Sequence, residues 1–410
     1  MYLTKFEEGM LNGEYGYARA LALKVIVRVG EALGAQELVE VSHAHISGIS
    51  YLNIGDAGLE FIEDIVNAGG TAYVFTSANP YMVLSDFLGC KHDDKVINKQ
   101  LRIVNALNKL GVKFYTCVPY NVRPPRYGEH LAWAESNAVL YANSVLGALS
   151  NKEGGPLALL AAITGRTYKS GVHLRDNRRP EVLFNVKVLD GVNLGFLGLV
   201  IGELTGSKIP YISNLRFRCT YELKQFLAAL GTTSNTPIAI IQGVTPDYKE
   251  LIDGVEFEEV YDLGSESIKS YVKVFKENVL NGNGLYLVGC PHLSFNELVG
   301  FLRRAVGIVE GGGSSIDVRG RELWITTYEG FLNDEVIKLV DKLSKYNVKV
   351  VVNGCAVVSR LDSVKVDYVV TDSVKASSYI SRLSRIPTLV LPRDDLLSMY
   401  FLKKINLKLM

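Results

Sequence analysis

This chain has few of the features that mark nucleic-acid-binding or membrane proteins. It has 44 Lys and Arg against 43 Asp and Glu, a net charge of +1, and no block of like charges. A basic surface for nucleic acid or a polybasic membrane anchor is therefore not indicated. Its longest apolar stretches, at residues 155–165 and 192–204, fall short of the roughly 18–20 residues that a membrane-spanning helix needs. We expect a globular protein without nucleic-acid or membrane partners.

Cysteine pairs at short spacing are also missing. The chain has five cysteines, and none are close enough in sequence for the local motifs of zinc ribbons and ferredoxins. The odd cysteine count, the length of 410 residues and the lack of a signal peptide argue against a disulfide framework. Free thiols indicate a reducing cytoplasm. No P-loop, G-x-G-x-x-G or G-x-S-x-G motif occurs, so nucleotide-binding and serine-hydrolase functions lack their signatures.

Short apolar stretches alternate with helical patterns through most of the chain. The alternation occurs three times near the N-terminus, and a second regular series begins at Pro237. This predicts an α/β fold of doubly wound, mainly parallel sheets with helices on both faces. We expect an N-terminal α/β region over 1–235 and a C-terminal doubly wound domain over 236–410. Residues 118–180 are polar and are expected to form a binding surface, whereas 190–225 are expected to be a connection.

Three of the five cysteines follow the same kind of segment. GVKFYTC ends at Cys117, GLYLVGC at Cys290 and VKVVVNGC at Cys355, and turn-forming residues follow each apolar stretch. Because open α/β sheets bind ligands at the carboxyl ends of their strands, we expect the three thiols to converge there. Three thiols would hold an iron–sulfur cluster with one iron not bound by protein. Cys90 and Cys219 lack such a preceding strand.

Two other interpretations of these thiols remain open from the sequence. Each can be a small buried hydrophobe, as free cysteines commonly are, in which case the chain would be a non-catalytic α/β binding subunit. A tetrahedral structural zinc would need a fourth ligand, and His292, two residues after Cys290, is the candidate. Thiols on distant strands suit a cluster better than zinc.

Other polar segments also follow predicted strands. His43 and His45 lie in a predicted loop over 42–50, where no third metal ligand is near and contact with a substrate oxyanion is favoured. The predicted loop over 76–80 precedes an expected helix and would offer N–H groups to an anion. Residues 135–137 open another predicted helix. Basic side chains suited to a phosphate or carboxylate are Arg123, Arg126, Arg166 and Lys169.

Longer stretches resemble one known family across nearly the whole chain. The most specific are AWAESNAVLYANSVLGA at 132–148 and TCVPY at 116–120. The others include HISGISYLNIGDAGLEFIE at 45–63, TSANP at 76–80, GCPHLS at 289–294 and TDSVKASSYI at 371–380. In these stretches the chain resembles aconitase X, a family of iron–sulfur hydro-lyases. The resemblance implies an aconitase-like multi-domain α/β fold and an enzyme that removes water from its substrate.

The resemblance also implies which residues form the site. The family's cluster thiols fall on Cys117, Cys290 and Cys355, the same three that follow predicted strands. A [4Fe-4S] cluster is expected, because a cubane held at three corners offers an iron to the substrate, and a 2Fe-2S form stays open. The implied substrate-binding residues are Gly48, Ile49, Ser50, Asn79, Pro80, Ser136, Asn137 and Lys375.

The family's activities give the expected reaction. The resemblance favours dehydration of (R)-5-phosphomevalonate to trans-anhydromevalonate 5-phosphate, in an archaeal-type mevalonate pathway of isoprenoid synthesis, and cis-3-hydroxy-L-proline dehydration is the alternative. Aconitase-like enzymes take their catalytic base, a serine, from a swivelling domain. This chain ends soon after TLVLP at 388–392 without one. We therefore expect a small swivel-domain subunit that supplies the base and forms a heterodimer.

Overall fold

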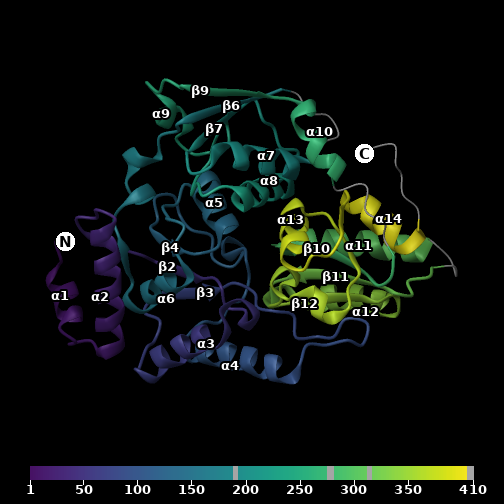
Figure 1. Ribbon diagram of the computed structural model, residues 1–410, viewed down its shortest axis with the longest axis horizontal. Helices are drawn as coiled ribbons and strands as arrows, with labels where there is room; N and C mark the ends of the chain where they lie inside the picture. The colour runs from purple at the N-terminus through teal and green to yellow at the C-terminus, as the bar shows by residue number, and fades with distance from the viewer. Residues whose placement is uncertain (188–192, 275–280, 312–315, 404–410) are drawn as a thin grey trace.

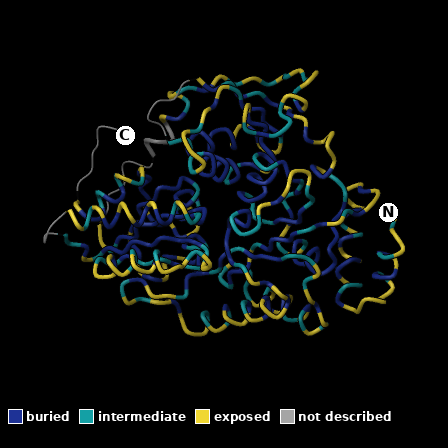
Figure 2. The backbone as a smooth tube through the Cα atoms, turned by 180° about the vertical axis from the view of Figure 1, so that it is seen from behind, coloured by how far each residue is buried: buried dark blue, intermediate teal, exposed yellow. Residues whose placement is uncertain are grey.

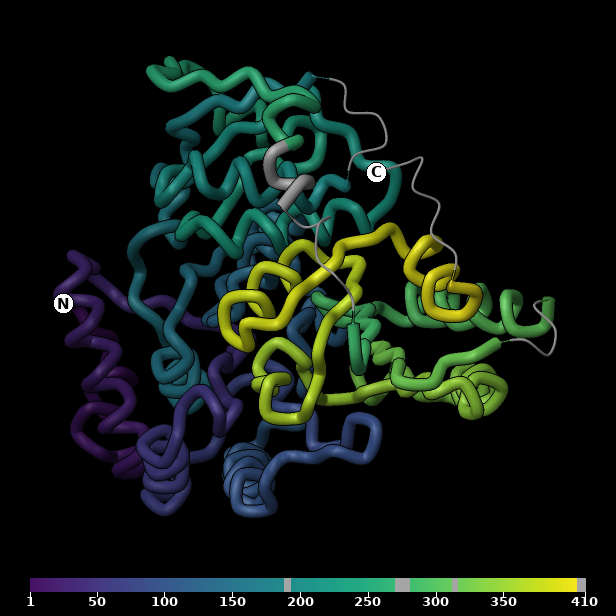
Figure 3. The backbone as a smooth tube through the Cα atoms, turned by 45° about the vertical axis from the view of Figure 1, so that its right-hand side comes forward, coloured from purple at the N-terminus to yellow at the C-terminus, as the bar shows by residue number. Residues whose placement is uncertain are grey.

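The computed structural model describes residues 1–187, 193–274, 281–311 and 316–403, and within them the chain forms three parallel sheets and one antiparallel strand pair (Figure 1). The parallel sheets follow one another along the chain. Figure 3 shows the parts of the chain that carry them as three neighbouring bodies, coloured purple to blue, teal to green, and green to yellow. Buried residues concentrate in the sheets and on the helix faces that cover them (Figure 2). The predicted α/β fold with mainly parallel sheets is confirmed. None of the described helices has the length and apolarity needed to cross a bilayer.

The first part of the chain builds a three-stranded sheet in the order β3-β2-β4. Its central strand is fully buried, because strands on both sides and helices cover it. The small antiparallel pair joins β1 and β5. The elements of this part are α1 (Lys5–Leu11), α2 (Tyr17–Ala32), β1 (Leu38–Glu40), β2 (His43–Ile46), α3 (Tyr51–Asn67), β3 (Phe75–Ala78), α4 (Asp94–Leu110), β4 (Leu131–Trp133), α5 (Ser136–Val145), α6 (Gly155–Thr164) and β5 (Arg166–Tyr168).

The second part builds a four-stranded parallel sheet in the order β8-β7-β6-β9. Helices α7 and α8 pack in close backbone contact beside it, because a Cβ atom at Gly198 would lie only 2.3 Å from the backbone oxygen of Phe226. The elements are β6 (Val182–Val186), α7 (Leu194–Thr205), β7 (Pro210–Ser213), α8 (Thr220–Thr233), β8 (Ile240–Ile241), α9 (Tyr248–Ile252), β9 (Glu259–Leu263) and α10 (Ser265–Val274).

The third part builds a five-stranded parallel sheet in the order β12-β11-β10-β13-β14. Its central strand is buried along its whole length. The elements are β10 (Gly284–Leu293), α11 (Phe295–Gly311), β11 (Arg321–Thr327), α12 (Asp334–Leu343), β12 (Val348–Val352), β13 (Tyr368–Thr371), α13 (Val374–Leu383), β14 (Thr388–Val390) and α14 (Arg393–Leu402).

The connection predicted over 190–225 is wrong. Helix α7, strand β7 and the start of α8 lie there, and all three belong to the second part. Gly198 and Gly202 lie inside α7, at positions where that helix touches α8. The series expected from Pro237 is likewise divided, since β8 and β9 pair with β7 and β6. The second sheet therefore takes strands from both sides of residue 235, and a domain boundary at that residue stays a prediction.

Two predicted loops are partly strands. His43 and His45 lie in β2 rather than in a loop, and residues 76–78 belong to β3. The helix expected directly after residue 80 is absent from the described residues, where α4 begins only at Asp94. Polar residues are tolerated in these buried strands because their side chains form hydrogen bonds with one another across the sheet.

The binding surface predicted over 118–180 is largely core. Helices α5 and α6 lie in this range and are mostly buried. The polar residues of α5 are hydrogen-bonded inside the protein, since Asn143 Nδ2 donates to the carbonyl oxygens of Ser150 and Pro237 at 2.8 Å each. Only the first turn of α5 reaches the candidate site described below.

Arg166 and Lys169 hold carboxylates of the chain rather than a free anion. Arg166 is buried, and its guanidinium contacts Glu7 and Glu40 at 2.8 Å each. Lys169 pairs with Glu37 at 2.6 Å on the surface. Arg166 therefore joins α1 to β1 and β5, and Arg123 likewise holds a carboxylate of the chain, that of Glu129 at 2.5 Å.

Replacing Arg166 with Ala should destabilise the chain by about 3–5 kcal/mol, because it leaves the carboxylate of Glu7 buried and unpaired. The control is Lys169→Ala, which breaks an exposed pair and should cost less than about 1 kcal/mol. Urea unfolding followed by circular dichroism measures both. Equal losses in the two variants would contradict this account of the Arg166 pair.

Candidate active site

The structure brings the three cysteines around one buried lysine. Cys117 follows a bridge to Ala78 at the end of β3. Cys290 lies in β10, where the pairing of this strand with β11 is interrupted, and Cys355 follows β12. All three sulfur atoms interact electrostatically with the ammonium group of Lys375. The role of the thiols as ligands stays a prediction.

The donor set fits a cluster better than a single ion. Burial raises the pKa of Cys117 to about 12 and also raises the pKa of Cys290 and Cys355, while the charge of Lys375 lowers each of them in part. Within the described residues, no three His, Cys, Asp or Glu side chains are placed to hold one metal ion. A cubane binds each thiolate through a different iron, so its ligands need not meet at one point.

The ring of His292, the fourth ligand considered for zinc, is bound to other groups of the protein. Its Nε2 donates to the carbonyl oxygen of Gly354 at 3.1 Å, and its Nδ1 lies 3.3 Å from the hydroxyl of Thr116. Burial lowers the pKa of His292 to about 4, so the ring is neutral and each nitrogen has one role. Zinc binding by this ring would break one of these contacts.

The ion pair between Lys375 and Glu135 forms the electrostatic centre of the site. Nζ and Oε1 are 2.6 Å apart, and each side chain is only 13% exposed. The carboxylate also accepts from Asn79 Nδ2 at 2.6 Å and from Asn137. Burial alone would raise the pKa of Glu135, but Lys375 and the two amides lower it to about 2, and the carboxylate in turn raises the pKa of Lys375. Both groups are therefore charged at neutral pH.

Two buried histidines extend this network away from the ion pair. His45 Nε2 lies 2.8 Å from Asn79 Oδ1, and Ser77 Oγ lies 2.8 Å from both His45 Nδ1 and His43 Nε2. Burial lowers the pKa of His45 to about 4, so the ring is neutral. One order of donors satisfies these contacts, from His43 through Ser77, His45 and Asn79 to Glu135. The network thereby directs the amide N–H of Asn79 at the carboxylate.

Sequence patterns indicate only a small part of this hydrogen-bond network. His43 and His45 alternate as residues of one strand, which places both rings on one face. Their partner Ser77 lies on β3, and register pairs it with His45. Glu135 opens α5, as predicted, but its ion pair spans 240 positions and is not visible in the sequence.

The remaining predicted substrate-binding residues lie on three short segments. Ser50 Oγ donates to the carbonyl oxygen of Val358 at 2.9 Å, in the turn that follows Cys355. Ile49 is buried, and its carbonyl oxygen accepts from Gln100 at 3.0 Å. Gly48 is exposed and has a φ of 69°, a backbone conformation that favours glycine.

Pro80 and Ser136 complete the set. Pro80 is buried next to Tyr81, whose carbonyl oxygen accepts from the N–H of Cys355 at 2.8 Å. Ser136 is half-buried and is the first residue of α5. The structure thus gathers Asn79, Asn137 and Lys375 on Glu135, and it places Ser50 and Pro80 beside the Cys355 segment. Substrate contact by these residues stays a prediction.

A cavity of about 520 Å³ lies on the other side of Cys290. The first turns of α7, α8, α11 and α14 line it, and so does Gln225, whose Nε2 donates to the carbonyl oxygen of Cys290 at 3.1 Å. The residues around the ion pair do not line this cavity. It is therefore a neighbour of the candidate site rather than its interior.

Parallel sheets that carry three thiols near a largely buried ion pair define a multi-domain α/β protein. The chain belongs to the aconitase X family. Models of the first, second and third domains of aconitase X match residues 1–176, 180–273 and 284–400.

Individual relatives agree with this family. The phosphomevalonate dehydratase large subunit of Thermococcus kodakarensis is 36% identical, over 88% of this chain and 90% of that protein. The one of Aeropyrum pernix is 38% identical, over 93% of this chain and 96% of that protein. A cis-3-hydroxy-L-proline dehydratase of Pseudomonas aeruginosa is 34% identical, over 72% of this chain and 52% of that protein. The crystal structure of holo-form aconitase X from Thermococcus kodakaraensis matches 98% of this chain with a TM-score of 0.87 and 32% identity.

Replacing Glu135 with Gln should destabilise the chain by about 3–4 kcal/mol at neutral pH, because Lys375 then stays buried without its anion. The pKa of Glu135 is about 2 when folded and about 4.5 ordinarily, so the wild-type advantage should be complete above about pH 4.5 and lost as the pH falls toward 2. Urea midpoints of both proteins at several pH values test this. The exposed-pair variant Asp56→Asn is the control, and a Glu135→Gln deficit that stays constant from about pH 5 to 3 would contradict the assignment.

Proposed function

We propose that this chain is the large subunit of a phosphomevalonate dehydratase. It would remove water from (R)-5-phosphomevalonate to give trans-anhydromevalonate 5-phosphate, a step of an archaeal-type mevalonate pathway. The observation that carries the proposal is the convergence of Cys117, Cys290 and Cys355 on the Lys375–Glu135 ion pair. Relatives with this name align with 90% and 96% of their own length, whereas the hydroxyproline dehydratase aligns with only 52% of its length.

The three thiols would hold a [4Fe-4S] cluster. Cys117 and Cys290 are buried and Cys355 is half-buried. This suits the role, because a dry site protects a cluster from solvent and favours replacement of thiol protons by iron. When bound, the cluster would supply a Lewis-acidic iron with an open coordination position for the leaving hydroxyl. Free thiols and such a cluster suit the reducing cytoplasm, where we expect the protein to work.

The residues of this chain would hold and orient the anionic substrate. Lys375 keeps its proton because Glu135 lies beside it, and it offers a fixed positive charge to a carboxylate. Helix α5 has Glu135 as its N-cap residue, and among the described side chains none caps this start. The first N–H groups of α5 are therefore available to a carboxylate or phosphate, whereas the N–H of Tyr51 at the start of α3 donates to Gln100 Oε1 at 2.8 Å. Asn79 and Asn137 keep the carboxylate of Glu135 ionised next to the bound anion.

A base must still take the proton from the carbon next to the substrate carboxylate. We propose that a small swivel-domain subunit supplies it and closes the site as the second half of a heterodimer. The names of the relatives, which call them large subunits, support a smaller partner.

Serine in place of Cys117, Cys290 or Cys355 should lower the iron bound after anaerobic reconstitution at least about tenfold, because each serine removes one cluster ligand. The control is Cys219→Ser, an exposed cysteine that should leave iron and sulfide unchanged. Iron and sulfide analysis of the chain purified with its small subunit checks this. Full iron content in all four variants would contradict the ligand assignment.

Activity assays of the same complex identify the substrate. Turnover of mevalonate 5-phosphate, and none of cis-3-hydroxy-L-proline, is the result that we expect, measured by loss of substrate under anaerobic conditions. Turnover of the proline alone would make the alternative correct. A wild-type complex that takes up no iron and acts on neither compound would support the non-catalytic binding subunit instead.

A further inference from the structure

One histidine touches all three cysteine segments. The backbone N–H of His292 donates to Cys117 Sγ at 3.2 Å, and its ring contacts Thr116, the residue before Cys117. The other ring nitrogen donates to the carbonyl oxygen of Gly354, the residue before Cys355. His292 itself follows Cys290 by two positions in β10. The three segments otherwise belong to different elements of the fold.

The imidazole is suited to this double contact because it is buried and has one polar partner at each ring nitrogen. Only 2% of His292 is exposed. Gly354 offers a carbonyl oxygen, which only accepts, so the ring proton is on Nε2. Thr116 Oγ1 accepts the N–H of Val118 at 3.2 Å and can therefore give its own proton to Nδ1 of His292. Each partner thus requires the same tautomer of the ring.

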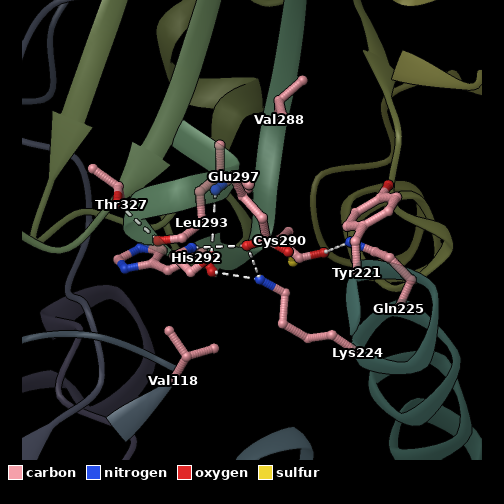
Figure 4. A network of polar contacts seen from close by, with 12 residues as sticks. Val118, Tyr221, Lys224, Gln225, Val288, Cys290, His292, Leu293, Glu297 and Thr327 are labelled. Carbon is pink, nitrogen blue, oxygen red and sulfur yellow. Dashed lines mark hydrogen bonds and ion pairs between the residues drawn. The ribbon is translucent and has the colours of Figure 1, made fainter. Parts of the chain in front are cut away.

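The segment that carries His292 is itself anchored to α8 (Figure 4). Lys224 Nζ donates to the carbonyl oxygen of His292 at 3.0 Å and is paired with Glu297. Gln225, the next residue, donates to the carbonyl oxygen of Cys290 at 3.1 Å. The side chains of Lys224 and Gln225 are both buried. Since α8 fixes this segment, the ring of His292 can hold the other two segments against it.

We propose that His292 is a positioning residue whose ring clamps the Thr116–Cys117 and Gly354–Cys355 segments to β10, so that the three thiols are placed before a cluster arrives. The proposal rests on the proposed function for the identity of the cluster, but the clamp itself is a property of the chain alone. Its ring acts on segments next to the cysteines and not on a sulfur atom.

Substitution of His292 can separate the role of its side chain from the role of its backbone N–H. Any replacement other than proline keeps the N–H that donates to Cys117, so a change in behaviour reports the ring. His292→Ala removes both ring contacts. His292→Gln can reach the carbonyl oxygen of Gly354 with its amide N–H and restores one of them. His173→Ala is the matched control, because His173 is also a buried histidine, 3% exposed, and its ring contacts His130.

The first test uses the full-length chain without metal. Alkylation of each cysteine by iodoacetamide is followed by mass spectrometry, with the exposed Cys219 as an internal reference. Loss of two hydrogen bonds should speed the labelling of Cys117 and Cys355 about tenfold or more in His292→Ala. His292→Gln should recover part of the protection at Cys355, and His173→Ala should label as the wild type does. Unchanged labelling of both cysteines in a folded His292→Ala protein would overturn the proposal.

If His292→Ala fails to fold, Thr116→Val provides the second variant, since it removes only the hydroxyl that contacts Nδ1. It should speed the labelling of Cys117 and leave Cys355 close to wild type, and equal labelling of Cys117 in Thr116→Val and wild type would overturn the clamp.

The second test follows the cluster. In the anaerobically reconstituted complex, a chelator should remove iron from His292→Ala roughly tenfold faster than from wild type or from His173→Ala. The electron paramagnetic resonance signal of the reduced cluster should broaden in His292→Ala as the ligand geometry loosens. Equal iron-loss rates and spectra would overturn the role of the ring. A wild-type chain that binds no iron would refute the proposed function, while the alkylation test would still decide whether the clamp exists.

Discussion

The ion pair between Glu135 and Lys375 is the contact on which the site depends. Its partners come from the first and the third part of the chain and are both largely buried. A buried charge that loses its partner costs roughly 3–5 kcal/mol, so the starts of α5 and α13 must stay together for either group to remain ionised. The three thiols and the amides of Asn79 and Asn137 surround this pair. Formation of this ion pair therefore also brings the residues of the candidate site together.

Neutral hydrogen-bonding groups surround the two charged side chains and fix the orientation of the groups around them. Burial lowers the pKa of both His45 and His292 to about 4, so these rings act as hydrogen-bonding groups with one defined tautomer each. His45 orients Asn79 toward Glu135, and His292 holds the segments next to two cysteines. Charge at the centre and neutral hydrogen bonds around it make a preorganised site, which is the arrangement that stabilises developing charge without rearrangement.

The sequence predicted those parts of the site that local patterns encode. The apolar run before Cys355 is a strand, and Glu135 to Asn137 do open a helix. The strand predicted to stop at Cys290 continues to Leu293, and among the described residues the run before Cys117 pairs only through a bridge at Tyr115. What the sequence could not show are pairings between distant elements, such as Glu135 with Lys375 or Ser77 with two histidines. A polar residue that is buried and satisfied looks in the sequence like a residue of a binding surface, as for His43 in β2 and Asn143 in α5.

The central claim is that three cysteines of this chain hold a cluster whose fourth iron meets the substrate. Mössbauer spectroscopy of the iron-enriched complex, before and after addition of mevalonate 5-phosphate, tests it most directly. The account predicts that the substrate changes the signal of one iron site and leaves the cysteine-bound irons nearly unchanged. A spectrum that the substrate does not change, or one in which all irons respond alike, would contradict the claim.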